Sequence, residues 1–407
     1  MKVGQFIYTW GNGHYSRMSK VDHILRQRED IDIHYYSGEE ICKKILEKFP
    51  QNSENIHTIT MPTPIDGKTG PSVPKSLLNF LLPVKGRPPL VKQISTYLKK
   101  EAQFYNKEKF DIVINDGDIG SNILAQKRDI PSLFITNQFR TRLWRSRMYL
   151  YPSMYYISKQ IAKATKIIVA DSPPPYTICE YNLNFSKDVE KNVVYSGHFA
   201  QKTQRSDTEF TILEKLVMGV DFGYWVRTGN KSTNEYTGER YERVFHSDEM
   251  KKEKRLISHA VPDPNINSVL GMDGNRYSIE YAWERKIEWV QIDIGFLSEN
   301  EKDTVLSNAK YVVVNGSHTI MGEVLGINAK PIIGVPLYDE HTNQLLWAES
   351  KGLGIMAQNE RNIIQAVSRI HKNFVDYEAR VKEFSKNFVS EGAKTTVAIM
   401  EEMLKDK

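Results

Sequence analysis

The residues with the clearest chemical potential form a short polar loop that reads Asn315-Gly316-Ser317-His318-Thr319. Apolar residues at helical spacing follow it, and Ser317 or Thr319 can cap that helix. The first amides of a helix have no partner within it, and the helix dipole adds positive potential, so such a loop can bind an anion. Gly316 would let the backbone approach the anion closely, and the side chains of His318 and Thr319 would add donors.

Acidic and amide side chains follow this loop at positions that suit hydroxyl groups. Glu323 lies one helical turn further on, where its carboxylate can accept hydrogen bonds from a ribose diol. Asp339, Glu340, Asn343 and Gln344 cluster further along and offer many partners for other hydroxyls. The order along the chain predicts sites for a diphosphate, a ribose and a sugar.

Two apolar segments would position these residues. Tyr311–Val314 has the β-branched, apolar composition of a buried strand, and Pro331–Pro336 has the composition of the next one. Together with the helix between them, they predict a strand–loop–helix–strand unit with the polar loop at the carboxyl end of the first strand.

A second candidate group lies near the N-terminus. The first eight residues are typical of a strand, and Gly11-Asn12-Gly13-His14 lies between that strand and a predicted helix. A glycine-rich turn in this position is often a phosphate loop, although the full dinucleotide fingerprint is missing. The alternative is a tight turn with a solvent-facing His14. Arg17 could meet an anionic acceptor or cover the helix surface, and we expect it to cover the surface.

The polar loop and its surroundings resemble the donor-binding signature of GT-B-fold nucleotide-sugar glycosyltransferases. The resemblance is to plant and animal UDP-glycosyltransferases and to the bacterial N-acetylglucosaminyltransferase that makes lipid II. The matching residues are the loop from Asn315 to Thr319, Glu323, Ala329-Lys330-Pro331, Pro336, Asp339-Glu340 and Asn343. Two positions depart from the pattern, because Asn315 replaces a phosphate-binding histidine of the plant enzymes and Glu340 replaces a glutamine. His318 would take over the phosphate contact.

This resemblance implies an α/β fold of the GT-B type, with two Rossmann-like domains facing a cleft. Residues 1–195 would bind the acceptor, residues 196–380 would bind the nucleotide sugar, and a helix within 381–407 would cross back to the first domain. The implied reaction moves a sugar from a nucleoside-diphosphate sugar, with UDP favoured, to an acceptor hydroxyl. Inversion and no obligatory metal or other cofactor are expected. A nucleotide-sugar 2-epimerase on the same fold is the alternative.

The resemblance also assigns roles at the N-terminal turn and after the predicted strand Asp111–Asn115. His14 would be the general base, and Asp116 would orient its imidazole. Asp118 is the second candidate for that role and a candidate acceptor contact. Two alternatives stay open: an Asp-x-Asp motif binds metal in the other major glycosyltransferase fold, and either aspartate can simply cap the next helix.

Further donor contacts are expected around the same nucleotide. Gly13 belongs to the N-terminal turn, and Gly229, Asn230 and Lys231 follow the predicted strand Tyr224–Arg227. Phe296 lies after another predicted strand, where related enzymes contact the base. Core packing is the alternative for Phe296.

A basic, aromatic-rich segment provides candidates for the acceptor. Arg140, Arg142 and Trp144 belong to it, and its spacing predicts an amphipathic helix. Such a face can bind an anionic lipid-linked acceptor, a membrane surface or a phosphorylated soluble acceptor, or its arginine stems can cover apolar surface. The apolar run Leu77–Leu82 is either a core helix or a surface element that touches lipid.

Composition sets the outer limits. A chain of 407 residues with 40% hydrophobic and 11% aromatic residues is expected to fold into two domains. It contains no apolar run long enough to span a membrane, and its first residues are expected to form a strand because they lack the apolar core of a signal peptide. Two distant cysteines, Cys42 and Cys179, favour a reducing compartment without a metal cluster. We therefore expect a cytoplasmic location, with the inner face of the cell membrane as an option. The net charge of +5 permits an anionic partner, and no nucleic-acid-binding motif is evident.

Overall fold

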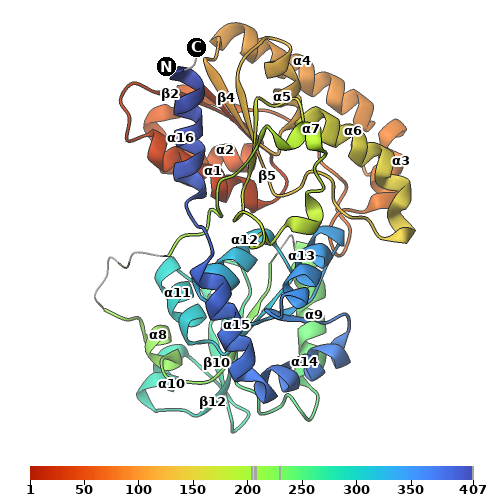
Figure 1. The fold of residues 1–407 in the computed structure, drawn as a ribbon. Coiled ribbons are helices and arrows are strands. Elements are labelled where there is room, and N and C mark those ends of the chain that lie inside the picture. The colour runs from red at the N-terminus through yellow and green to blue at the C-terminus, as the bar shows by residue number, and fades with distance from the viewer. Residues whose placement is uncertain (203–204, 206–208, 229–230, 406–407) are drawn as a thin grey trace.

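The structure, a computed structural model, describes residues 1–202, 205, 209–228 and 231–405. The chain forms two lobes that face one another, each built on a sheet with helices around it (Figure 1). The first sheet has seven parallel strands in the order β3-β2-β1-β4-β5-β6-β7. They are β1 (Lys2–Ile7), β2 (Asp32–Ser37), β3 (Ile56–Thr58), β4 (Ile112–Asp116), β5 (Ser132–Thr136), β6 (Lys166–Val169) and β7 (Val193–Tyr195).

Helices pack on both faces of this sheet. The principal ones are α1 (Asn12–Leu25), α2 (Glu39–Lys48), α3 (Val73–Leu81), α4 (Leu90–Glu108), α5 (Ile119–Gln126), α6 (Tyr151–Ile161) and α7 (Lys187–Glu190). Alternate residues of β1 point to opposite faces. Val3 and Ile7 therefore pack with α1 on one side, and Phe6 packs with α4 on the other.

The second sheet has eight strands in the order β11-β10-β12-β9-β8-β13-β14-β15. They are β8 (Gly223–Val226), β9 (Arg255–Ser258), β10 (Ser268–Gly271), β11 (Arg276–Tyr277), β12 (Trp289–Ile294), β13 (Tyr311–Val314), β14 (Ile332–Gly334) and β15 (Gly354–Met356). β10 and β11 run antiparallel, whereas the other pairs are parallel. The sequence of Asn267–Gly271 predicts the second strand of this lobe, but that segment forms the antiparallel β10, and β9 is the parallel neighbour of β8.

The helices of the second lobe cover its sheet in the same way. They are α8 (Ile212–Val217), α9 (Lys231–Phe245), α10 (Ile279–Glu284), α11 (Glu299–Asn308), α12 (His318–Met321), α13 (Asp339–Ser350), α14 (Glu360–Lys372) and α15 (Phe374–Lys386). α12 continues directly into a π-helical stretch, Gly322–Ile327. α8 lies in the segment 207–219, to which the sequence assigns no role; residues 207 and 208 are outside the described part.

The last helix, α16 (Gly392–Lys405), returns to the first lobe and packs beside α1 (Figure 1). This confirms the predicted crossing. The sequence pattern predicts one continuous helix from Lys382 to Leu404, and that prediction is wrong. Val381 and Phe384 belong to α15 and to the core of the second lobe, so only the helix that begins at Gly392 crosses over.

The last strand of the first sheet ends at Tyr195 and the first strand of the second begins at Gly223. The predicted domain boundary at residue 195 coincides with the end of the first sheet. Among the described residues, none of the helices is both long enough and apolar enough to cross a membrane.

Candidate active site

The N-terminal turn and the end of β4 bring two predicted residues together. β1 and β4 are adjacent parallel strands, and Ile7 pairs with Asp116. The turn after β1 therefore lies beside Asp116, and α1 presents His14 to it. Nδ1 of His14 lies 2.6 Å from Oδ1 of Asp116. The structure thus forms the predicted imidazole–carboxylate pair.

Arg17 completes this cluster, although the sequence predicts a place for it on the helix surface. Its side chain is buried, its Nε donates to Asp116 Oδ2 across 2.8 Å, and one terminal nitrogen donates to Oδ1 across 2.7 Å. Burial disfavours the Asp116 carboxylate, but the charge of Arg17 and the hydrogen bonds from Arg17 and His14 outweigh burial and lower the pKa of Asp116 below its usual value. The surface role expected for Arg17 is wrong, because its guanidinium pairs with the buried carboxylate of Asp116.

The ionised Asp116 fixes the state of the imidazole. A carboxylate only accepts hydrogen bonds, so the hydrogen between Nδ1 of His14 and Oδ1 of Asp116 is carried by Nδ1. Nε2 of the neutral ring then carries the free lone pair, and it has no hydrogen-bond partner among the described residues. The side chain of His14 is 22% exposed, so the imidazole is partly open to the solvent.

A glycine after Asp116 makes room for the ring. Gly117 has a φ of +78°, a conformation that favours glycine, and a Cβ at this position would lie 2.6 Å from Cε1 of His14. The turn after β4 therefore requires glycine for both conformation and space.

Asp118 has a different environment. Its carboxylate accepts from the backbone amide of Ser121 across 3.2 Å and from the hydroxyl of Tyr97, and it caps α5. It is buried, and burial raises its pKa. The structure gives Asp118 the capping role, in place of the predicted acceptor contact.

In the second lobe, β13 lies between β8 and β14 and delivers the polar loop to the lobe interface. Asn315 accepts from the Ser317 amide across 2.9 Å and donates to Thr228, so it shapes the loop. Gly316 has a φ of +93°, and a Cβ there would lie 2.8 Å from the carbonyl oxygen of His341. The close approach predicted for Gly316 is made to protein backbone. Ser317 is the N-cap of α12 by position, without a side-chain cap.

His318 faces the first lobe. Its Nε2 lies 3.0 Å from Oδ2 of Asp171, its side chain is buried, and its carbonyl accepts from His198 across 3.1 Å. Burial and the neighbouring His318 lower the pKa of His198 well below the usual range, so His198 is neutral. The imidazole expected to contact a phosphate is instead engaged in an interlobe hydrogen bond.

Thr319 is the loop residue nearest to the N-terminal turn. A Cβ built on Gly13 would lie 3.6 Å from Thr319 Oγ1, and the side chain of Thr319 is partly exposed. The start of α12 and the turn that carries His14 therefore meet across the lobe interface. Two predicted regions more than 300 positions apart converge here.

Glu323 is partly exposed and forms an ion pair with Lys302 of α11, with a nitrogen–oxygen distance of 3.3 Å. Lys302 makes a second pair with Glu299 at 3.3 Å. Burial lowers the pKa of Lys302, but these two carboxylates outweigh burial and raise it.

The residues predicted to hold the sugar lie at the start of α13, and each contacts the first lobe. Asp339 pairs with Arg147 at 3.3 Å, and Glu340 accepts from Asn137 across 2.9 Å. Asn343 is buried and donates to the carbonyl of Arg142 across 2.8 Å. These side chains link the lobes in this conformation.

The remaining donor candidates are less connected. Gly229 and Asn230 lie outside the described residues. Lys231 begins α9 and is exposed, and Phe296 follows β12 with 66% of its surface exposed. The exposure of Phe296 rules out the core-packing alternative.

The predicted amphipathic helix around Trp144 is wrong in its first half. Residues 141–144 are not helical, and a 3₁₀ turn, Arg145–Leu150, precedes α6. The guanidinium of Arg140 lies 5.2 Å from the ring centre of Tyr155, and that of Arg142 lies 5.9 Å from Tyr181. Trp144 is 43% exposed. Because the segment is extended here, its side chains do not share one helical face.

No family model matches the chain. In sequence, the chain is 24% identical over 371 residues to a protein of Methanosarcina mazei described as an uncharacterized glycosyltransferase. The match covers 88% of this chain and 85% of that protein. A protein of Methanosarcina acetivorans with the same description is 22% identical over 376 residues, with the same coverage.

Solved structures share the architecture along nearly the whole chain. The glycotransferase of kitacinnamycin has a TM-score of 0.63 at 11% identity and covers 99% of this chain and 98% of its own. The chain has the GT-B fold. MurG of Acinetobacter baumannii has a TM-score of 0.57 at 12% identity, covering 99% and 100% of the two chains. A UDP-N-acetylglucosamine 2-epimerase has a TM-score of 0.56 at 15% identity, covering 100% and 96%.

In this GT-B protein, two groups of described residues have the composition of metal ligands. They are His34 with His57 and Glu108, and Asp171 with Cys179 and His318. Neither contains His14 or Asp116.

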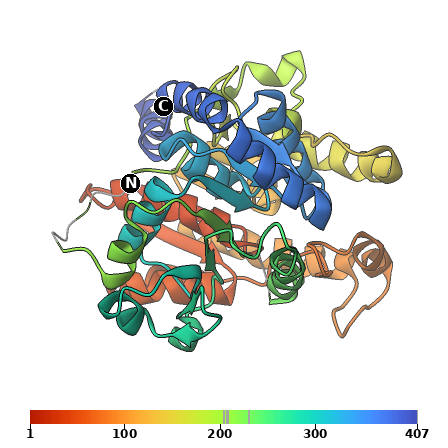
Figure 2. The same ribbon diagram turned by 90° about the horizontal axis from the view of Figure 1, so that it is seen from below.

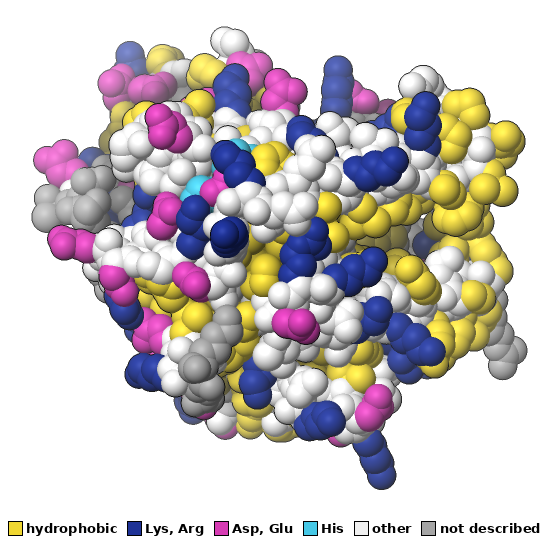
Figure 3. Space-filling view, turned by 90° about the horizontal axis from the view of Figure 1, so that it is seen from above, with side chains coloured by type: hydrophobic (Ala, Val, Ile, Leu, Met, Phe, Trp, Pro, Cys, Tyr) yellow, Lys and Arg dark blue, Asp and Glu magenta, His cyan; other side chains and the backbone are white. Residues whose placement is uncertain are grey.

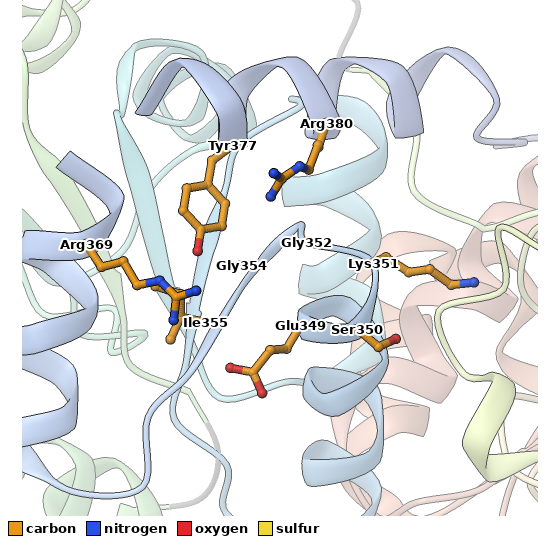
Figure 4. A pocket seen from close by; sticks show the side chains of 9 residues that line it. All are labelled: Glu349, Ser350, Lys351, Gly352, Gly354, Ile355, Arg369, Tyr377 and Arg380. Atoms are coloured by element: carbon orange, nitrogen blue, oxygen red, sulfur yellow. The ribbon is translucent and has the colours of Figure 1, made fainter. Parts of the chain in front are cut away.

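The GT-B protein also has a hollow of about 380 Å³ at the far side of the second lobe. Arg369 of α14, Tyr377 and Arg380 of α15, and Glu349 of α13 surround it (Figure 4). None of the predicted site residues lines this hollow, so it is separate from the lobe interface.

Proposed function

We propose that this chain is a glycosyltransferase that moves a sugar from a nucleoside-diphosphate sugar to an acceptor hydroxyl with inversion. The observation that carries the proposal is the His14–Asp116 pair, beside a turn whose Gly13 faces Thr319 of α12 across the lobe interface. The glycosyltransferase relatives in sequence support the same activity.

His14 would act as the general base. Its unprotonated Nε2 takes the proton of the acceptor hydroxyl while that oxygen forms a bond to the anomeric carbon. The bond from the anomeric carbon to the diphosphate breaks in the same step, and the nucleoside diphosphate leaves. Asp116 stabilises the imidazolium that forms, as in other imidazole–carboxylate pairs. Attack from the face opposite the leaving group inverts the anomeric centre.

The second lobe would hold the donor. The opening amides of α12 and the Thr319 hydroxyl would meet the diphosphate, and Glu323 would accept from the ribose. UDP is favoured by the resemblance of the signature, and no metal is required where helix amides balance the leaving charge. Asp339, Glu340 and Asn343 would bind the sugar once the lobes separate, because their present partners belong to the first lobe.

A ligand screen tests this proposal. Thermal unfolding is measured with a panel of nucleoside diphosphates and their sugars, since a ligand at 100 times its Kd stabilises a protein by about 2.7 kcal/mol. We expect one nucleoside diphosphate and its sugar to raise the Tm and the nucleoside alone to have little effect. Absence of any stabilisation across the panel would contradict the proposal.

A nucleotide-sugar 2-epimerase is the second candidate, because a structure of such an enzyme shares the fold over the whole chain. The sequence relatives favour transfer. Incubation of the stabilising sugar nucleotide without an acceptor distinguishes the two. An epimerase changes the configuration at C2 of the sugar, whereas a transferase leaves the donor unchanged.

A further inference from the structure

α3 exposes apolar side chains that a soluble helix normally buries. Its sequence is mostly apolar, yet only Asn79 is buried within it. Leu77, Leu78, Phe80 and Leu82 are exposed, and Leu81 is 71% exposed. Asn79 anchors the helix by donating to the carbonyls of Leu82 and Pro88. The helix is therefore held by a polar contact and directs its leucines outward.

α6 and the 3₁₀ turn before it expose a second apolar set. Met148, Tyr149 and Ile157 are exposed, and Tyr156 is 63% exposed. More than half of the large apolar side chains that the described residues expose belong to residues 77–94 and 144–157. α3 and α6 project from the same end of the first lobe (Figures 1 and 2). We call this end the α3–α6 surface.

Both segments are free of acidic residues. Residues 67–100 and residues 130–170 contain no aspartate or glutamate, and each stretch carries seven lysines or arginines. Figure 3 shows apolar side chains at this end of the molecule with lysine and arginine side chains beside them. Exposed apolar groups in segments whose only charged side chains are cationic complement a layer that is apolar inside and anionic outside.

We propose that the α3–α6 surface docks on an anionic lipid bilayer. The leucines and Phe80 of α3 would enter the boundary between headgroups and acyl chains. The tyrosines of α6 would lie at the headgroups, where amphipathic rings are favoured. A second copy of the chain is a poorer occupant, because two such surfaces would bring like charges together.

The docking surface adjoins the lobe interface. Arg147, which lies between the α3–α6 surface and the second lobe, pairs with Asp339 of α13 at 3.3 Å. If the proposed function holds, an enzyme docked in this way would take its acceptor hydroxyl from a molecule embedded in the same bilayer. Docking itself does not depend on the proposed function.

Vesicle flotation tests the docking. The full chain is mixed with vesicles of phosphatidylglycerol or of phosphatidylcholine, and the bound fraction is measured at low and high salt. We expect binding to phosphatidylglycerol that weakens as salt rises. The double variant Leu78→Ser/Leu81→Ser should bind at least about tenfold more weakly. In the double variant Lys75→Glu/Lys85→Glu, binding to phosphatidylglycerol vesicles should weaken about fivefold or more for each lysine replaced.

Matched controls lie on the second lobe. Val375 is 77% exposed on α15, and Lys252 is exposed, so Val375→Ser and Lys252→Glu should bind as the wild type does. All four substituted residues of the docking surface are exposed, so unchanged thermal unfolding checks that the variants fold. The proposal is overturned if the wild type fails to bind phosphatidylglycerol, or binds both lipids equally. It is also overturned if the double leucine variant binds vesicles as the wild type does and loses only the self-association that sedimentation measures.

Discussion

His14 and Asp116 come from different elements of the first lobe, α1 and β4, and Nδ1 of the imidazole lies 2.6 Å from Oδ1 of the carboxylate. Arg17 binds both oxygens of the same carboxylate. These hydrogen bonds hold the Asp116 carboxylate in place and favour its ionised form. Asp116 can therefore orient the imidazole of His14. The following predictions depend on this arrangement and on the loop that faces it.

Arg17→Met should change how stability depends on pH. In the wild type the pKa of Asp116 is below its usual value of about 3.9, so ionised Asp116 adds stability above that pH. This contribution to the free energy of unfolding is lost as pH falls through the lowered pKa. Without Arg17, burial raises the pKa of Asp116. The contribution of ionised Asp116 to the free energy of unfolding then becomes unfavourable. We expect the Tm of the variant to fall less than that of the wild type on acidification from about pH 6. Parallel Tm–pH curves would exclude Arg17 as the group that keeps Asp116 ionised.

Gly117→Ala should displace the imidazole. The new Cβ would meet Cε1 of His14 at 2.6 Å, and the φ of +78° adds a strain of about 1–2 kcal/mol. We expect a loss of turnover of about tenfold or more, since small misplacements of a catalytic group are costly. Gly219 has a φ of +73° with nothing within 4 Å of a Cβ, so Gly219→Ala carries the strain without the clash. Equal turnover in Gly117→Ala and Gly219→Ala would show that His14 does not need the space beside Gly117 to take up its position.

Glu323→Ala should weaken donor binding by about tenfold if the carboxylate accepts from the ribose. Glu299→Ala is the matched control, because both glutamates pair with Lys302 at the same distance of 3.3 Å. Calorimetric titration with the stabilising nucleoside diphosphate should therefore separate the two variants. If both bind the nucleotide as the wild type does, Glu323 has no ribose contact.

Thr319→Val tests the start of α12. A hydrogen bond to a charged group contributes about 1.5–3 kcal/mol, so loss of the hydroxyl should weaken binding of the nucleoside diphosphate by about tenfold or more. Binding of the nucleoside alone should not change. Thr395→Val, at a partly buried threonine in α16, is the control. A Thr319 variant that binds the diphosphate normally would place the phosphates elsewhere.

Much of the sheet structure could be predicted because its strands are continuous apolar runs. The predicted strand Tyr311–Val314 has the same bounds as β13, since four consecutive β-branched or aromatic residues mark the strand in the sequence. β9 was missed because it opens with Arg255, a residue that strands rarely bury. Its side chain is satisfied by Gln291 and by two backbone carbonyls, which only the folded chain brings together.

The candidate site could be predicted where a local pattern carries it, as in the turn before His14 and the loop before α12. The role of Arg17 could not, because its partner Asp116 lies 99 positions away and only the pairing of β1 with β4 brings them together. The interlobe hydrogen bonds of His318 and Asn343 also lack a local signal. Each depends on how two separately folded lobes meet.

The most direct measurement compares turnover and donor affinity in His14→Ala. The wild type, His14→Ala and His23→Ala, an exposed histidine of the same helix, are assayed for sugar transfer and titrated with the donor. We predict that His14→Ala loses about two to four orders of magnitude in kcat while its donor Kd and the turnover of His23→Ala stay near the wild-type values. Wild-type kcat in His14→Ala would contradict the assignment of His14 as the general base.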